Sequence, residues 1–235
     1  MSLADPGALP RTPEYFCQEE DRIVDELARA RMAHLLHHRK AGLALGEPVV
    51  PVISVATTFH LPQAQGAAYY YGRSGQPTWD AVEAQLAILE AAEVVAFPSG
   101  MAAISAALIG CLRAGAKVMI PSDGYYVTRL LGRDLLAVYG VDVVEVPTLE
   151  MAAADFAGFD VIYIETPSNP GLDVIDIAAV AARAHAAGAL VIADNTTMTP
   201  LLQRPLDLGA DLVVAADTKA PAGHSDALFG HVAGR

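Results

Sequence analysis

The chain changes its hydrophobic pattern near residue 93. Beyond that point, short runs that are apolar throughout alternate with longer stretches in which apolar residues recur at helical spacing. Runs of the first kind are typical of strands buried on both faces, and stretches of the second kind are typical of helices. This alternation predicts the α/β class, a mostly parallel sheet with helices on both faces. The predicted strands are 94–97, 117–120, 141–146, 160–165, 189–193 and 211–216, and the predicted helices between them are 100–113, 127–139 and 177–187.

The first part of the chain has a different organisation. Residues 1–13 contain three prolines and little apolar pattern, which predicts a loose tail. Residues 14–41 combine apolar positions at helical spacing with many charges, so we expect an amphipathic helix there. Glycine and proline recur through residues 42–78, which predicts an extended, irregular arm, and residues 79–92 predict a second amphipathic helix.

Composition narrows the class of protein. With 235 residues, 53% of them hydrophobic and 18% charged, the chain can form a substantial packed core. A formal net charge of −12 argues against a general affinity for nucleic acid or for anionic membranes. The start lacks a secretory signal pattern, no apolar run approaches the ~20 residues of a membrane span, and two cysteines, Cys17 and Cys111, cannot form a disulfide framework. We therefore expect a cytoplasmic protein with neither nucleic acid nor membrane as a partner.

Two polar residues at strand ends carry the first chemical signal. Asp194 follows the predicted strand 189–193, and Lys219 follows the predicted strand 211–216. In an open α/β sheet the carboxyl ends of parallel strands line the ligand crevice. A carboxylate and an amine presented there together suggest a pyridoxal phosphate site, in which the lysine forms a Schiff base and the aspartate keeps the pyridine nitrogen protonated. The alternatives are that Asp194 caps a following turn and that Lys219 is a solvated surface lysine.

Two further turns belong to the same predicted edge. Ser99, Gly100 and Met101 join a strand to a helix, and free N–H groups at that helix start can cradle a phosphate. The alternative is an ordinary turn in which Ser99 caps the helix. Asn169 lies in a proline-flanked turn and can reach the crevice with its amide, or it can satisfy the local backbone.

Five motifs in sequence order resemble one enzyme family, the Cys/Met-metabolism family of pyridoxal phosphate enzymes. That family includes cystathionine γ-synthase, cystathionine γ-lyase, methionine γ-lyase and homoserine-ester sulfhydrylases. The resemblance covers roughly residues 47–235, and it implies the large domain of the PLP-dependent transferase fold type I there, after an N-terminal tail and helix at 1–46. The motifs that carry it are Tyr71–Thr78, Ser99–Ala103, Glu165–Pro170, Asp194–Thr196, and Thr218-Lys219 with Gly223–Asp226.

The resemblance assigns a role to each part of the predicted cofactor site. It implies that Lys219 holds pyridoxal 5'-phosphate covalently and later moves protons at the substrate. Asp194 would pair with the pyridinium nitrogen. The backbone at Gly100 and Met101, together with the Thr218 hydroxyl, would bind the phosphate.

The remaining roles also come from the resemblance alone. Tyr125 matches the tyrosine that stacks on the cofactor ring and assists the leaving group, and Asn169 matches the residue that bonds the phenolic oxygen. Tyr71 and Arg73 match residues that reach the phosphate of the neighbouring subunit's cofactor. The resemblance therefore implies a homodimer or homotetramer.

The sequence departs from the family pattern in three places. A phosphate-binding serine is usual three positions before Lys219, but this chain has Ala216, and the missing hydrogen bond corresponds to about 1 kcal/mol. Tyr126 and Val127 replace the small residues that usually follow the stacking tyrosine, and the cysteine of methionine γ-lyases is absent there. The family's C-terminal small domain, which supplies an arginine for the substrate carboxylate, is expected to be absent from this chain.

Two hypotheses about function follow. The first is a PLP-dependent lyase or γ-replacement transferase acting on a sulfur-containing amino acid or activated homoserine. The second is a binding or assembly subunit that needs a separate chain to supply the C-terminal domain, or that is not catalytic. A metal site at His34, His37 and His38 is not expected, because no carboxylate or cysteine pattern accompanies the three histidines.

Overall fold

The first residues that the structure describes form a helix, as their charge and apolar spacing predict. The structure is a computed structural model that describes residues 19–61 and 66–235. The predicted tail 1–13 lies outside the described residues. The helix expected over 14–41 is observed as α1 (Glu19–His37), followed by the short turn η1 (Lys40–Gly42).

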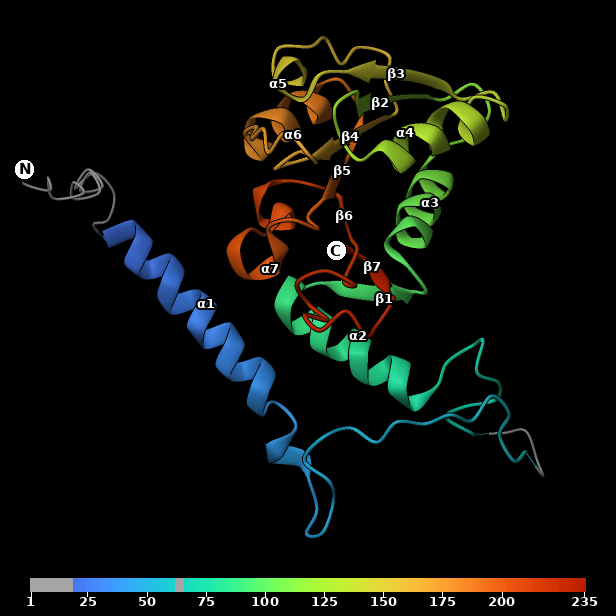
Figure 1. Cartoon of the computed structure of the whole chain (residues 1–235), viewed down its shortest axis with the longest axis vertical. Helices are drawn as coiled ribbons and strands as arrows, with labels where there is room; N and C mark the ends of the chain where they lie inside the picture. The colour runs from blue at the N-terminus through green and yellow to red at the C-terminus, as the bar shows by residue number, and fades with distance from the viewer. Residues whose placement is uncertain (1–18, 62–65) are drawn as a thin grey trace, which may run out of the picture.

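A seven-stranded sheet forms the centre of the molecule (Figure 1). Its strand order is β1-β7-β6-β5-β4-β2-β3, and the five strands from β6 to β3 are parallel. The α/β class predicted from the hydrophobic pattern is therefore confirmed. The strands are β1 (Glu93–Phe97), β2 (Lys117–Pro121), β3 (Asp142–Val146), β4 (Val161–Glu165), β5 (Leu190–Asp194), β6 (Leu212–Ala215) and β7 (Gly230–Gly234).

Strand β7 was missed by the sequence analysis. Its residues are Gly-His-Val-Ala-Gly, and two glycines with a histidine hide the apolar run that marks the other strands. The strand lies between β1 and β6 and is antiparallel to both, so the sheet is mixed. Because β7 follows β6 in sequence, the connection between them folds back at the sheet edge and carries Lys219.

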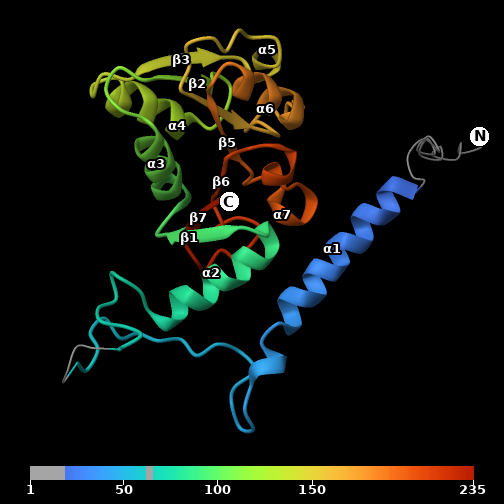
Figure 2. The same cartoon turned by 180° about the vertical axis from the view of Figure 1, so that it is seen from behind.

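Helices cover both faces of the sheet (Figure 2). In β4, Ile162 and Ile164 pack in one core cluster with α6 (Ile177–Ala186), while Val161 and Tyr163 pack in another with α3 (Gly100–Cys111). This division follows from the two-residue period of a strand, which sends successive side chains to opposite faces. The fully apolar β4 run thus has a helix on each side.

One predicted helix is divided in the structure. Residues 127–139 were expected to form a single helix, but α4 (Tyr126–Leu131) gives way to a π-helical segment, η2 (Gly132–Leu136). A Cβ on Gly132 would lie 3.0 Å from Val143 Cγ1 and 3.2 Å from Ile120 Cδ1, so the helix approaches the sheet closely at this point. Three short elements, α5 (Thr148–Met151), α7 (Thr199–Leu202) and η3 (Pro205–Leu208), were not predicted.

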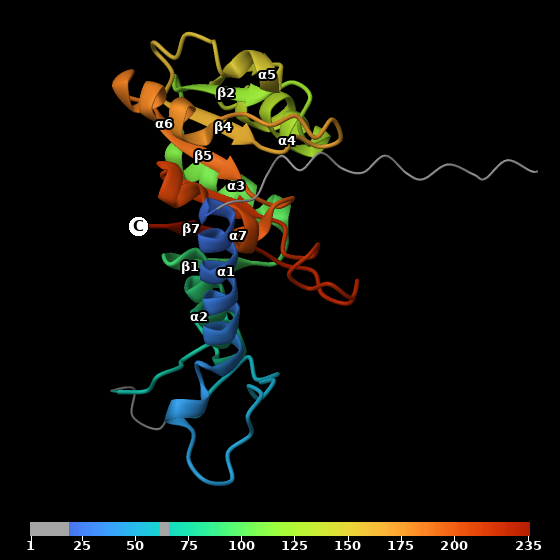
Figure 3. The ribbon, with the colours of Figure 1, turned by 90° about the vertical axis from the view of Figure 1, so that its left-hand side faces the viewer.

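Helices α1 and α2 and the arm lie beside the sheet (Figure 3). Helix α2 (Pro77–Glu90) begins two residues before the predicted start and packs on β1, while α1 packs against α2 and α7. The arm between η1 and α2 is extended where the structure describes it, and it exposes Val50, Val52 and Ile53. No helix in the described part of the chain is long and apolar enough to cross a membrane.

Neighbouring positions on α3 allow a direct test of this packing. Leu108 is fully buried against the sheet, whereas the next residue, Ile109, is 53% exposed. We expect Leu108→Ala to lower the free energy of unfolding by about 2–5 kcal/mol, because it leaves a cavity in the core. Ile109→Ala removes a similar side chain from the surface and should change it by about 0.5 kcal/mol or less. Urea unfolding measures both, and equal effects would contradict the burial of this face of α3.

Candidate cofactor site

A cavity of about 330 Å³ lies where the carboxyl ends of β4, β5 and β6 meet the start of α3. The predicted site residues that line this cavity are Gly100, Met101, Tyr125, Asn169, Asp194, Thr218 and Lys219. The other two predicted residues, Tyr71 and Arg73, lie on the arm and do not line it.

Sheet register brings Asp194 and Lys219 to the same cavity. Strand β5 ends at Asp194, which lies beside Val214 of the parallel neighbour β6. The chain leaves β6 at Ala215, turns, and presents Lys219 on the cavity wall. The Thr218 backbone N–H donates to the Phe229 carbonyl at 3.2 Å and thereby ties the turn to the residue before β7. Both side chains are therefore carried by ordered backbone at one sheet edge.

Asp194 is a buried carboxyl group with several hydrogen-bond donors. The Tyr163 hydroxyl donates to Asp194 Oδ2 at 2.9 Å, and the Thr196 backbone N–H donates to Oδ1 at 2.9 Å. Burial raises the pKa of Asp194, while the hydrogen bonds of Thr196 and Tyr163 and the charge of His231 oppose that rise. A cation placed in the cavity would favour the ionised form further. Asp194 does not serve merely as the cap of a turn.

The start of α3 lies very close to the end of β6. Ser99 Oγ accepts a hydrogen bond from the Ala102 N–H at 3.0 Å, so Ser99 is the N-cap of the helix. A Cβ on Gly100 would lie only 2.4 Å from Ala216 Cβ. The first N–H groups of a helix have no intrahelical acceptor, and those of Gly100 and Met101 lie at the cavity. Ser99 therefore caps the helix, and the helix start also lies at the cavity, while its binding of a phosphate stays a prediction.

Ala216 stands where the family pattern has a serine, and its neighbour across the sheet is a threonine. Thr196 Oγ1 accepts a hydrogen bond from the Ala216 N–H at 2.9 Å, which joins the ends of β5 and β6. Thr196 and Thr197 also line the cavity. The hydroxyl groups on this wall thus come from the residues after Asp194 and from Thr218.

Glu165 is a cavity residue that sequence reasoning did not single out. Its Oε2 accepts a hydrogen bond from the Tyr125 N–H at 2.6 Å, and its carboxylate also accepts one from the Asn169 backbone. Burial, followed by the charge of Asp194, raises the pKa of Glu165 to about 7. The signal in the sequence that could have identified Glu165 is its position as a charged residue at the end of an otherwise apolar strand. Glu165 positions the backbones of two predicted site residues at once.

Tyr71 and Arg73 lie together on the arm. The Arg73 guanidinium carbon is 5.1 Å from the centroid of the Tyr71 ring, and Tyr71 is 44% exposed. The arm is fixed near this point by a bridge between Thr58 and Tyr71. The expected contact of these two residues with a neighbouring subunit's cofactor stays a prediction.

The cavity residues fit pyridoxal 5'-phosphate. An amine, a buried carboxylate and a helix N-terminus line one cavity, and they match the cofactor's aldehyde, pyridine nitrogen and phosphate respectively. In the described part of the chain, no group of three or more His, Cys, Asp or Glu side chains is arranged to bind a metal ion.

Comparison with known proteins gives the same class. The fold is that of the fold type I PLP-dependent enzymes, and the chain belongs to the family described as Cys/Met metabolism PLP-dependent enzyme, whose model matches residues 33–235. The apo crystal structure of CalE6, a methionine gamma lyase from Micromonospora echinospora, superposes with a TM-score of 0.78 and 40% identity, covering 86% of this chain and 56% of that one.

Sequence relatives support the same family. A Streptomyces coelicolor protein assigned as a cystathionine gamma-lyase is 48% identical over 195 residues, which are 80% of this chain and 50% of that protein. The cystathionine beta-lyase MetC of Bacillus subtilis is 44% identical over 183 residues, covering 76% of this chain and 47% of the relative. The chain therefore spans about half the length of the curated relatives it matches.

Two glycines of α3 provide a matched test of the close approach to β6. Gly100→Ala should lower the free energy of unfolding by about 1–3 kcal/mol, because its Cβ would overlap Ala216. Gly110→Ala meets nothing within 4 Å and should raise that free energy by about 0.5–1 kcal/mol. Chemical denaturation of both variants measures the difference, and a stabilised Gly100→Ala chain would refute the close packing.

The raised pKa of Glu165 predicts a pH-dependent stability. The folded chain holds the Glu165 proton up to about pH 7, whereas the unfolded chain releases it near pH 4.5, so this group makes stability fall as pH rises between these values. For the chain without cofactor, we expect the loss to be on the order of 3 kcal/mol. Glu165→Gln should remove this part of the slope, and Glu150→Gln, an exposed control, should keep it. Urea unfolding at pH 4.5, 5.5 and 7.5 tests this, and identical slopes in wild type and Glu165→Gln would contradict it.

Proposed function

We propose that residues 47–235 form the cofactor-binding large domain of a PLP-dependent lyase or γ-replacement transferase. Its substrate would be a sulfur-containing amino acid or activated homoserine, and it would act in the cytoplasm. The observation that supports this proposal is the presence of Lys219 and the buried Asp194 on the wall of one cavity. Family membership and the names of the relatives point to the same class of carbon–sulfur chemistry.

In this proposal the protein residues bind, orient and move protons. When bound, pyridoxal 5'-phosphate supplies an electron sink for the substrate α-carbon. Lys219 would hold the cofactor and then carry a proton between the substrate Cα and neighbouring atoms. Asp194 would keep the pyridine nitrogen protonated, and the N–H groups of Gly100 and Met101 with the Thr218 hydroxyl would bind the phosphate.

Tyr125 and Asn169 would set the orientation of the ring. Glu165 holds the backbone of both residues, so the stacking tyrosine and the amide that bonds the phenolic oxygen are positioned by one carboxylate. The ring of Tyr126 lies edge-on to that of Tyr125, with centroids 5.4 Å apart. Tyr126 therefore supports Tyr125 from the outside, and we expect this bulk to shape the substrate side of the cavity.

Assembly forms a further part of the proposal. Tyr71 and Arg73 would reach the phosphate of the neighbouring subunit's cofactor in a homodimer or homotetramer. The forked donors of an arginine suit a phosphate, and the exposed apolar side chains of the arm supply surface for contact with a second copy.

Reductive trapping tests the cofactor part of the proposal. The purified chain is incubated with pyridoxal 5'-phosphate, treated with borohydride and digested, and the modified peptide is identified by mass spectrometry. The chain has three lysines, Lys40, Lys117 and Lys219, and we expect the label on Lys219. Lys219→Ala should lose the visible absorbance of the bound cofactor, whereas the exposed Lys40→Ala should retain it. A label on another lysine, or none, would refute the proposed site.

Turnover is tested separately on the same preparation. Release of sulfide or ammonia from cysteine, homocysteine or cystathionine would support catalysis by this chain. Cofactor binding without release would instead favour the assembly hypothesis, in which a separate chain supplies the C-terminal domain. Addition of a relative's C-terminal domain in trans would then distinguish an incomplete site from a non-catalytic one.

A further inference from the structure

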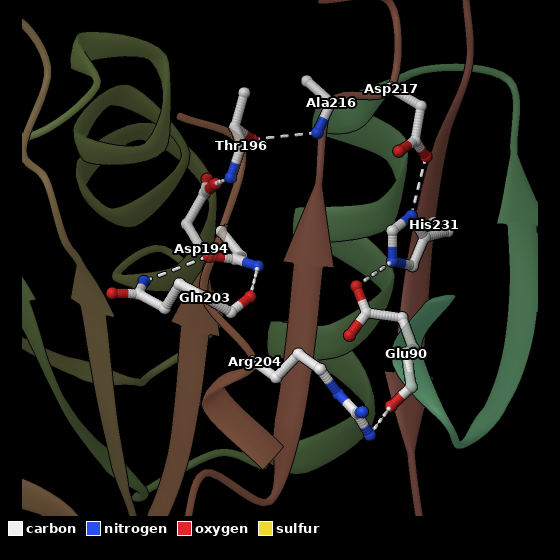
Figure 4. Close-up of polar contacts among 9 residues, drawn as sticks. Glu90, Asp194, Thr196, Gln203, Arg204, Ala216, Asp217 and His231 are labelled. Atoms are coloured by element: carbon white, nitrogen blue, oxygen red, sulfur yellow. Dashed lines mark hydrogen bonds and ion pairs between the residues drawn. The ribbon is translucent and has the colours of Figure 1, made fainter. Parts of the chain in front are cut away.

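Three buried charged side chains lie behind the lysine turn, which we define as residues 216–223. Asp217 belongs to the turn, His231 to β7 and Glu90 to the end of α2, and each is 0% exposed. Figure 4 shows His231 between the two carboxylates. None of the three lines the cavity, so the proposed chemistry does not use them.

The geometry of the cluster indicates a histidine cation. His231 Nδ1 is 2.7 Å from Asp217 Oδ2, and Nε2 is 3.3 Å from Glu90 Oε1. An imidazole that faces carboxylate oxygens with both ring nitrogens donates from both only when it is protonated. In the part of the chain that the structure describes, no hydrogen-bond donor reaches Glu90 Oε2 or Asp217 Oδ1. His231 is thus the donor that both carboxylates share.

The electrostatics of the cluster agree with its geometry. Burial by itself lowers the pKa of His231, but the hydrogen bonds with Asp217 and Glu90 and the charges of both outweigh it and raise the pKa to about 9. The charge of His231 also acts against the burial that raises the pKa of Asp194. The imidazolium of His231 on β7 therefore influences Asp194, the carboxylate in the cavity wall. The Arg204 guanidinium also lies at the cluster and donates to the Glu90 carbonyl at 3.0 Å.

Backbone hydrogen bonds connect this cluster to Lys219. The Asp217 carbonyl accepts from the Ala222 N–H at 2.9 Å, and the Lys219 carbonyl accepts from the Gly223 N–H at 3.0 Å. Asp217 thus fixes the turn at two points, through its carbonyl within the turn and through its carboxylate on His231. Because Lys219 is two residues beyond Asp217, a displacement of Asp217 would move the amine in the cavity.

We propose that His231 is a positioning residue: its imidazolium, held between Asp217 and Glu90, fixes the lysine turn so that Lys219 faces Asp194 across the cavity. The proposal rests on the proposed function for the identity of the group that Lys219 binds. It assigns His231 a task that a neutral strand residue could not perform. Removing the cation would leave two carboxylates buried together without a shared donor, and one of them would have to move or take up a proton.

Histidine NMR on the chain without cofactor tests the charge state directly. In a ¹⁵N-histidine-labelled chain, we expect the His231 ring to remain an imidazolium through pH 8, since its pKa is about 9. The exposed His185, which pairs with Asp211, is the internal comparison. A neutral His231 ring at pH 7.5 would overturn the proposal, whatever the cofactor does.

Cofactor binding tests the positioning role. His231→Gln keeps a side chain that can hydrogen-bond but removes the charge, and we expect it to weaken pyridoxal 5'-phosphate binding about tenfold or more. The pH midpoint of the lysine-linked chromophore should also move upward, because a nearby positive charge has been removed. His185→Gln, which removes a surface histidine–aspartate pair, should change neither value. A folded His231→Gln chain with wild-type affinity and midpoint would overturn the proposal.

A second variant covers the case in which His231→Gln does not fold. Asp217→Asn preserves the shape of the side chain and removes one of the two anions around His231. We expect the His231 titration to shift to lower pH and the cofactor affinity to fall, and no change in either would overturn the proposal. Failure of the wild-type chain to bind the cofactor would reject the proposed function instead, and the NMR titration would still decide the state of His231.

Discussion

The pairing of β5 with β6 is the constraint on which the site depends. It places Asp194 at the end of one strand and starts the lysine turn at the end of its parallel neighbour. A carboxyl group as deeply buried as Asp194 is costly unless something compensates it, and here Tyr163 and Thr196 donate hydrogen bonds to it. The charge of His231 adds to this compensation, and a protonated pyridine ring in the cavity would add to it further.

Charge in this region is distributed over two sides of the sheet edge. Asp194 and Glu165 lie on the cavity side, and burial raises the pKa of both. Asp217 and Glu90 lie behind the edge and share the proton donors of His231. A buried ion pair contributes little to stability by itself, since desolvation offsets much of the attraction. The contacts of His231 with Asp217 and Glu90 instead have a positioning role, because they hold one end of the turn that carries Lys219.

Local sequence signals pointed to residues that the structure brings to one cavity. The turn at Ser99 could be recognised because its cap and its helix are adjacent in sequence, and Asp194 and Lys219 because each follows an apolar run. His231 could not be found in this way. Its partners are 14 and 141 residues away, and its strand has two glycines and too few apolar positions to be recognised. Glu165 was missed for a related reason, since its partner Tyr125 is 40 residues away in the sequence.

The start of the lysine turn, directly after β6, contributes side chains both to the cavity and to the cluster behind it. Along residues 216–218, Ala216 and Thr218 line the cavity while the side chain of Asp217 between them contacts His231. These residues belong to a turn that is closed by the hydrogen bond from the Lys219 N–H to the Ala216 carbonyl at 3.1 Å, and the turn presents neighbouring side chains to the cavity and to His231. The close contact of Gly100 with Ala216 constrains the cavity wall as well, because a larger residue at either position would separate α3 from the strand. The residues that face the cavity are therefore constrained from behind as well, and the position of Lys219 follows from both constraints.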